Sequence, residues 1–257
     1  MAQSNIEWTE LTWNPVTGCN KISPGCKNCY AEVMTRRLQF MGVEKYAGGF
    51  ALRTHLDTLN APFSWKKPKV VFVNSMSDLF HVDVPLDFIK AVFSVMNQTP
   101  QHIYQVLTKR SERLLEIASE LTWTDNIWMG VSVENQAYAY RIPELAKTQA
   151  KIKFLSIEPL IDELTQMDLT GINWVIVGGE SGHKARPIKR AWINTIKDTC
   201  ENERIPFFFK QWGKAKFNEN PNDPTIDAKH PQHAKGGCEL DGKIYREMPR
   251  VRSGAFL

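Results

Sequence analysis

The chain has 257 residues, of which 42% are hydrophobic and 23% charged, and a formal net charge of +4. This composition is ordinary for a soluble globular protein, the length suffices for a proper core, and no segment is of low complexity. The mildly basic charge permits an anionic partner without requiring one. No basic segment followed by an apolar run opens the chain, and no stretch approaches the roughly 20 apolar residues of a membrane span. We therefore predict a cytoplasmic protein whose thiols are reduced and which has no membrane partner.

The first element that the sequence predicts is a short strand. Residues 6–13 alternate weakly and are rich in aromatic and β-forming side chains. Asn14-Pro15 ends this segment, because proline cannot donate a backbone hydrogen bond. A loop rich in cysteine follows.

Three of the five cysteines lie in this loop, at Cys19, Cys26 and Cys29, whereas Cys200 and Cys238 are distant in the sequence. Asn, Ser, Pro and Gly stand between the three, and these residue types form turns that leave backbone N–H groups free. Three thiols converging in a reducing compartment are typical of a soft-metal site. Structural zinc takes four closed ligands, whereas an iron–sulfur cubane held by three thiolates keeps one iron open for chemistry.

A helix is predicted next, from Tyr30 to about Met41, because apolar residues recur there at spacings of three and four. Gly42 would end it. Residues 42–68 are rich in Gly, Lys and Pro and predict a long irregular excursion, with a short helix near His55–Leu59.

Six short apolar runs follow, and each ends in polar or charged residues. Amphipathic helical segments stand between most of them. Strands that are apolar throughout are covered on both faces, which is typical of a parallel sheet with crossover helices. The runs are residues 70–73, 103–107, 127–131, 152–155, 174–177 and 206–209, and the helical segments are 86–96, 111–121, 137–146 and 191–202.

With the first strand, the chain contains about seven βα units. We predict an α/β fold, a partial or open (β/α) barrel of about six to seven parallel strands, over residues 1–213. A doubly wound sheet is the alternative. Residues 214–257 lack this pattern and predict an irregular C-terminal extension or lid. In either fold the carboxyl ends of the strands gather on one rim, and the cysteine loop opens onto it.

The polar residues at the strand ends are the candidates for binding a ligand on this rim. The glutamates among them either contact the ligand or form rim salt bridges with Lys109, Arg110 and Lys210. Gly178 and Gly179, which follow the fifth of the apolar runs, would let a ligand approach the backbone closely. The candidates are Ser75, Ser77, Asp78, Ser132, Glu134, Glu158, Gly178, Gly179 and Glu180.

Basic residues on the predicted rim are the candidates for contacting a substrate. A polyanion such as nucleic acid would use them, and Trp65, Trp123 and Trp212 could stack on its bases. The alternative is that they are solvated surface residues whose stems cover apolar surface. The candidates are Lys109, Arg110, Arg186, Arg190 and Lys210.

The C-terminal extension contains a third group of candidate ligands. His230, His233 and Cys238 could hold a second metal ion, but proline and glycine nearby fit a flexible tail equally well.

A three-cysteine loop after the first strand, followed by a helix and a series of βα units, resembles the radical S-adenosylmethionine (radical SAM) enzymes over roughly residues 6–213. More narrowly, residues 13–19 and 23–31 are similar to a family of phage and prophage proteins that carries this motif and has no assigned reaction. Blocks at 131–135, 156–159 and 177–181 are similar as well.

The radical SAM resemblance implies that Cys19, Cys26 and Cys29 bind a [4Fe–4S] cluster whose fourth iron is chelated by the amine and carboxylate of SAM. One-electron reduction by a donor would cleave SAM to methionine and a 5′-deoxyadenosyl radical, which abstracts hydrogen from a substrate. Two features depart from the usual pattern Cys-x3-Cys-x2-Cys. The first gap here has six residues, and Asn28 stands where an aromatic residue usually precedes the third cysteine.

Three hypotheses follow. In the first, the protein is a radical SAM-type enzyme in which the strand-end residues hold SAM and an unidentified substrate. In the second, it is a zinc-stabilised nucleic-acid-binding protein without catalysis, in which Cys238 or a histidine is the fourth ligand. In the third, it is an iron–sulfur protein that does not use SAM, and the cluster is structural or a redox sensor.

Overall fold

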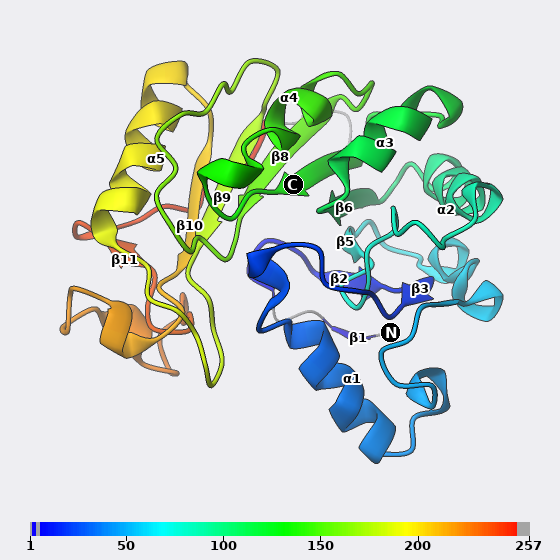
Figure 1. Ribbon diagram of the computed structural model, residues 1–257, viewed down its shortest axis with the longest axis horizontal. Helices are drawn as coiled ribbons and strands as arrows, with labels where there is room; N and C mark the ends of the chain where they lie inside the picture. Colours follow the sequence, from blue (N-terminus) through cyan, green and yellow to red (C-terminus); the bar gives the residue numbers. More distant parts are fainter. Residues whose placement is uncertain (1, 4–5, 251–257) are drawn as a thin grey trace.

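The centre of the fold is an eight-stranded sheet with the strand order β1-β2-β5-β6-β7-β8-β9-β10. The computed structural model describes residues 2–3 and 6–250. β1 pairs antiparallel with β2, and the strands from β2 to β10 form a continuous parallel series. The sheet curves into a half-barrel with helices on its outer side (Figure 1). The predicted partial barrel of about six to seven parallel strands is confirmed, and the parallel series has seven strands in the described part of the chain.

Each of the six predicted apolar runs forms a strand, and most extend further at the carboxyl end than predicted. Two small hairpin-like pairs, β3 with β4 and β11 with β12, lie outside the main sheet. The strands are β1 (Ala2–Gln3), β2 (Leu11–Trp13), β3 (Val16–Thr17), β4 (Arg53–Thr54), β5 (Val70–Val73), β6 (Ile103–Thr108), β7 (Ile127–Ser132), β8 (Ile152–Ile157), β9 (Trp174–Gly178), β10 (Phe207–Gln211), β11 (Glu239–Leu240) and β12 (Lys243–Ile244).

The first parallel strand is shorter than predicted. Only Leu11–Trp13 pairs with β5, and the backbone turns before it, where the Thr9 N–H donates to the carbonyl of Ile6 at 3.2 Å. The reason is Trp8, whose ring lies 4.9 Å from the Phe72 ring inside the half-barrel. Burial of the Trp8 indole stabilises the fold more than further strand pairing of residues 6–10 would.

The helices follow the predicted order, and two of them are divided. α3 continues as a 3-10 turn at Ala118–Glu120, and a 3-10 turn at Gln136–Tyr138 precedes α4. Pro143 explains the late start of α4, because a residue without an N–H is tolerated only in the first helical turn. The α-helices are α1 (Tyr30–Phe40), α2 (Leu86–Gln98), α3 (Ser111–Ile117), α4 (Arg141–Ala146) and α5 (Arg190–Glu203), and the other 3-10 helices are Pro24–Cys26, Glu44–Tyr46, Leu56–Thr58, Ala61–Ser64, Ala215–Phe217 and Pro224–Ile226.

Aromatic side chains fill the amino-terminal half of the half-barrel interior. The Trp174 ring lies 6.1 Å from that of Trp8, 6.2 Å from Trp128, 5.7 Å from Phe154 and 5.9 Å from Phe208. These rings form a cluster separate from the larger core between the sheet and its helices. Because this end is closed by side chains, a site inside the half-barrel has to lie toward the carboxyl ends of the strands.

The C-terminal extension covers the free edge of β10. The Phe209 N–H donates to the Tyr245 carbonyl at 3.1 Å, and the Glu247 N–H donates to the Phe207 carbonyl at 3.3 Å. The Trp174 indole donates to the Glu247 carbonyl at 2.8 Å. Covering the edge in this way prevents strand pairing with another chain. In the described part of the chain, no helix combines the length and apolar character that a membrane span requires.

Candidate functional site

The cysteine loop, which we define as residues 18–29, connects β3 to α1 and lies over the carboxyl ends of the parallel strands (Figure 1). Cys26 ends the 3-10 helix Pro24–Cys26, and Cys29 directly precedes α1. All three thiols are free and partly exposed. The predicted placement of the loop on the strand-end rim is confirmed by its side-chain contacts with the ends of β6, β7 and β9, described below.

The first contact comes from Arg110, which follows β6. Its guanidinium donates to the side-chain oxygen of Asn20 and to the Cys19 sulfur, the latter at 3.7 Å. It also pairs with the Asp78 carboxylate at 3.2 Å. Asp78 is itself held by the Thr108 hydroxyl, which donates to it at 2.7 Å. Arg110 thus brings a positive charge to the first cysteine while a neighbouring carboxylate balances it.

The second contact comes from Glu134, which follows β7 and is fully buried. The Ser23 hydroxyl of the cysteine loop donates to this carboxylate. Arg141 pairs with its other oxygen at 2.9 Å, and the Lys109 ammonium lies 3.7 Å away. A Cβ atom on Gly25 would lie 2.5 Å from Glu134 Cγ, so only glycine lets the loop approach this closely.

The third contact comes from Glu180, which follows β9. The Asn28 amide donates to Glu180 Oε2 at 3.0 Å and to the Lys184 carbonyl at 2.9 Å. The Arg186 guanidinium donates to both oxygens of Glu180, at 2.9 and 2.5 Å. Burial raises the pKa of Glu180, but the hydrogen bonds from Arg186 and Asn28 outweigh it, so the pKa lies below its ordinary value.

This lowered pKa predicts how stability depends on pH. A carboxyl group whose pKa is lower in the folded state stabilises the protein above its ordinary pKa of 4.5, and this contribution is lost as the pH decreases through the folded-state pKa. Glu180→Gln is expected to lower the free energy of unfolding by about 2 kcal/mol near neutral pH. The difference from wild type should decrease below about pH 4.5. Urea unfolding at several pH values measures it, with the exposed Glu120→Gln as control.

A fourth charged group faces the half-barrel interior. Lys210 of β10 donates to both oxygens of Glu158, at 2.8 and 3.0 Å, and lies 3.9 Å from the Glu7 carboxylate. Burial lowers the pKa of Lys210, but the two carboxylates outweigh it, so the pKa is raised and the ammonium stays charged. Lys210 is two residues beyond the inward Phe208 and so lies on the same face of β10. It therefore lies above the aromatic cluster, on the side of the cysteine loop.

The end of β5 is joined to the segment that leads into the cysteine loop. The Ser75 hydroxyl donates to the Asn14 side-chain oxygen at 3.2 Å, and the Ser77 hydroxyl donates to the Val16 carbonyl at 2.9 Å. The Tyr30 hydroxyl donates to the Met76 sulfur at 3.7 Å. The predicted residues Ser75 and Ser77 thus lie beside the cysteine loop, and both have partners within the chain.

The remaining predicted residues lie on β7 and at the end of β9. Ser132 is buried and aligned with Ser156 on β8. Gly178 is the last residue of β9, and a Cβ atom there would lie 3.3 Å from the Glu158 carboxyl carbon. A Cβ atom on Gly179 would overlap the Trp212 backbone. Close packing within the chain therefore accounts for both glycines.

The thiols of the loop differ in their surroundings. Burial and the Asp78 carboxylate raise the pKa of Cys19 to about 11, against the effect of Arg110. Burial also raises the pKa of Cys26, but a backbone hydrogen bond at Ile22 and the charge of Lys109 outweigh it, and the pKa is lowered. The two cations beside the loop would balance the negative charge of a thiolate-bound metal group.

Within residues 6–250, no three His, Cys, Asp or Glu side chains are arranged to hold a metal ion. Ligands of a single zinc lie within about 4 Å of one another, because each sulfur is about 2.3 Å from the metal. A cubane binds its three thiolates at three separate iron atoms and so accepts wider spacing. The loop offers three free thiols, and the Arg110 guanidinium donates to one of them at 3.7 Å, which is the donor chemistry that such a cluster would use.

The sequence offered His230, His233 and Cys238 as candidate ligands of a second metal ion, and two of them have hydrogen-bond partners within the extension. The Cys238 thiol donates to the Gln232 carbonyl at 3.3 Å, and the Gln232 N–H donates to His230 Nδ1 at 3.0 Å. Neither Cys238 nor His230 belongs to a group of side chains that could hold a metal ion in the described part of the chain. Backbone hydrogen bonds within the extension, rather than a metal, satisfy these side chains.

The predicted stacking surface of three tryptophans is wrong. Trp212 and Trp65 are buried in the main core, and Trp123 packs against it. The Trp212 indole donates to the Glu239 carbonyl, and the Trp123 indole donates to the Ala118 carbonyl, both at 2.9 Å. Burial of a large apolar ring in the core gains more free energy than its exposure on a rim.

The predicted substrate residues all lie in ion pairs. Besides the pairs of Lys109, Arg110, Arg186 and Lys210 described above, Arg190 pairs with Glu219 and Asp241, each at 3.3 Å. The rim salt bridges that the sequence offered as an alternative role for the glutamates are therefore present.

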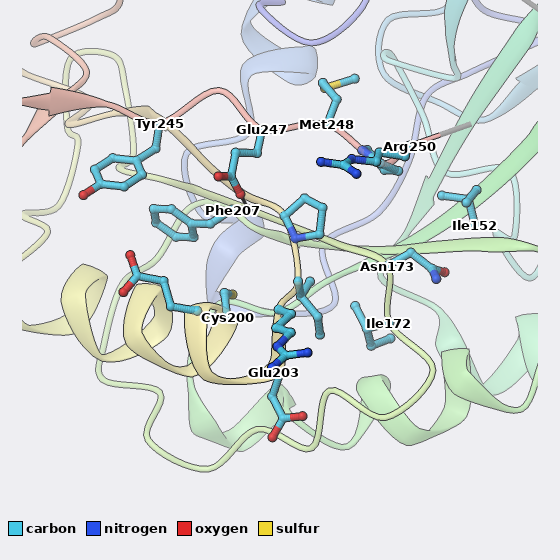
Figure 2. Close-up of a pocket in the computed structure, with 15 residues that line it drawn as sticks. Ile152, Ile172, Asn173, Cys200, Glu203, Phe207, Tyr245, Glu247, Met248 and Arg250 are labelled. Atoms are coloured by element: carbon cyan, nitrogen blue, oxygen red, sulfur yellow. Dashed lines mark hydrogen bonds between the residues drawn. The ribbon is translucent and has the colours of Figure 1, made fainter. Parts of the chain in front are cut away.

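A cavity of about 950 Å³ lies away from this site, at the amino-terminal end of β8, β9 and β10. Figure 2 shows Tyr245, Glu247, Met248 and Arg250 on one side of it and Cys200 of α5 on the other. Burial raises the pKa of Cys200 to about 12, so its thiol is unreactive. We place the candidate site at the cysteine loop and not in this cavity.

Sequence reasoning missed the side chains that attach the cysteine loop to the rim. Asn20 and Ser23 were interpreted only as turn residues, Asn28 only as a departure from the radical SAM pattern, and Arg141 was not considered. The available signal was a run of short polar side chains between the cysteines, which can donate and accept hydrogen bonds as well as form turns.

Residues 3–249 match the family described as "Protein of unknown function (DUF5131)", and the chain belongs to that family. A search of curated proteins finds no match. Among solved structures, the chain is similar to "Spore photoproduct lyase complexed with dinucleoside spore photoproduct", with 13% identity and a TM-score of 0.46 over 77% of this chain. The match spans 62% of the length of that structure. The function therefore has to be argued from the site itself.

Proposed function

We propose that this member of the DUF5131 family is an iron–sulfur enzyme of the radical SAM type. Cys19, Cys26 and Cys29 would hold a [4Fe–4S] cluster, and SAM would bind beside it on the rim of the half-barrel. One observation supports this most: the three-thiol loop lies across the carboxyl ends of the parallel strands and is attached to three of them by buried or half-buried carboxylate and guanidinium groups.

When bound, the cluster with SAM would supply a 5′-deoxyadenosyl radical after one-electron reduction. The chain's own residues would bind the cluster and SAM and would orient them. Arg110 and Lys109 would offset the negative charge of the thiolates. Asp78, Glu134 and Glu180 would fix the loop on the rim. The oxygens of the two glutamates accept hydrogen bonds from the loop, and Asp78 pairs with Arg110, which contacts the loop.

The pair Glu158–Lys210 is our candidate for contacting the amino-acid end of SAM. That end carries one ammonium and one carboxylate, and the pair offers one charge of each sign, 2.8 Å apart, on the inner side of the rim. Ser132 is a further candidate to donate to SAM, as are Ser75 and Ser77 at the end of β5. Gly178 and Gly179 would contribute only the shape of the backbone.

The test is cleavage of SAM. Protein reconstituted anaerobically with iron and sulfide, reduced with dithionite and given SAM should release methionine and 5′-deoxyadenosine slowly, even without substrate. Glu158→Gln should reduce this rate by at least about tenfold, because losing a charged partner costs roughly 1.5–3 kcal/mol. Asp125→Asn, in an exposed ion pair, is the control. A brown, reducible protein that releases neither product would favour the iron–sulfur protein without SAM, and a colourless protein with one zinc would favour the zinc hypothesis.

The sequence analysis left the substrate unidentified and offered nucleic acid as one candidate, which stays a prediction. The basic residues that would contact phosphates are neutralised by the chain's own carboxylates. A polyanion would have to displace these partners, so the electrostatics favour a smaller substrate.

A further inference from the structure

The outward face of α1 carries apolar side chains where a surface helix normally carries polar ones. Val33 is 66% exposed and Phe40 is 93% exposed. They lie seven residues apart and so share one face of the helix, while Ala31 and Thr35 are buried on the opposite face. Tyr30, which opens the helix, is exposed next to this face. Exposed apolar and aromatic side chains that alternate with arginine are typical of the core of an interaction site.

Basic side chains surround the apolar residues. Arg36 and Arg37 are exposed and flank the line from Val33 to Phe40. Lys21 and Lys27 extend the positive charge onto the cysteine loop. Glu32 is the acidic side chain of α1, and it is already paired with Lys21 at 2.9 Å and with Arg36 at 2.6 Å. The face therefore carries an excess of positive charge.

The position of α1 connects this face to the candidate site, because the helix begins at the residue after Cys29. Figure 1 shows α1 at the periphery, away from the helices that cover the sheet. Encounters between redox proteins bury less than about 1,200 Å² in total. Lys21 of the cysteine loop pairs with Glu32 of α1 at 2.9 Å, so a partner bound to this helix lies beside the loop.

We infer that this face, formed by Val33, Arg36, Arg37 and Phe40, docks an acidic one-electron carrier protein that reduces the cluster. The inference rests on the proposed function. In the transfer, the carrier's reduced cofactor loses one electron and the cluster accepts it. A second copy of the chain fits less well, because it would place basic side chains against basic side chains.

The experiment uses a flavodoxin, an acidic one-electron flavoprotein, as the probe. Binding of oxidised flavodoxin is measured by titration calorimetry, and reduction of the reconstituted protein is followed by bleaching of its visible absorbance. The variant is Val33→Glu with Phe40→Glu. Leu56→Glu is the matched control, because Leu56 is also an exposed apolar residue, at 72%, but lies outside α1.

We expect wild type and the control to bind flavodoxin with an affinity that falls as salt is raised, and the double variant to bind at least about tenfold more weakly. Dithionite should reduce all three proteins equally, because it needs no docking surface. If dithionite reduces wild type but flavodoxin binds the double variant as well as wild type, the docking inference alone is wrong. If wild type is dimeric and the double variant monomeric, the face belongs to a second copy. If dithionite cannot reduce wild type, the proposed function fails and the inference with it.

Discussion

Replacing Cys19, Cys26 or Cys29 individually by Ala is expected to remove most of the iron and sulfide from anaerobically purified protein. A cubane with only two thiolate ligands is poorly retained, so content should decrease from about four iron atoms per chain to a small fraction of that. Iron and sulfide analysis, together with the visible absorbance, measures the loss. The reason is structural: these thiols are free, partly exposed and on one loop.

Cys200→Ala and Cys238→Ala are the controls for this result. Both thiols are buried away from the cysteine loop, so their removal should leave iron and sulfide unchanged. Stoichiometric zinc that persists through reconstitution with iron and sulfide would contradict the prediction, as would iron retained in all three loop variants.

Glu134→Ala is expected to destabilise the protein by about 3–5 kcal/mol, because it leaves a buried guanidinium without its carboxylate. Arg141 and Glu134 are both almost completely buried. The variant also removes the acceptor for Ser23, so the cysteine loop should become more sensitive to proteolysis. Urea unfolding and limited trypsin digestion measure the two effects.

The matched control is Glu120→Ala, which breaks an exposed pair with Lys90. Exposed ion pairs contribute about 0–1 kcal/mol, so this variant should unfold almost as wild type does. If Glu134→Ala costs no more than Glu120→Ala, the carboxylate is not what attaches the loop to the rim.

Much of the fold could be predicted because its strands are continuous apolar runs that end abruptly in polar residues. Val70–Val73 shows this most clearly, since its predicted bounds are those observed. The first strand was mispredicted because alternation at residues 6–10 also fits a turn, and the decisive factor, burial of Trp8 among aromatic rings from distant strands, is not visible locally.

Only the chemical character of the candidate site, three thiols on one loop, could be predicted from the sequence. Cysteine spacing predicts a metal-binding loop, because three thiols so close together are typical of a soft-metal site. Which side chains hold that loop could not be predicted, because Asn28 and Glu180 are 152 positions apart and meet only through the fold. The carboxylates were recognised as important, but whether each contacts a ligand or its own chain depends on partners such as Arg141 that only the structure brings near.

The electron paramagnetic resonance spectrum of the reduced, reconstituted protein, recorded with and without SAM, tests the central claim most directly. Three thiolate ligands leave one iron open, and SAM binding at that iron changes its coordination. We predict that SAM alters the spectrum of wild type and that Glu158→Gln requires more SAM for the same change. A reduced cluster whose spectrum is identical with and without saturating SAM would contradict the radical SAM assignment while leaving the iron–sulfur site intact.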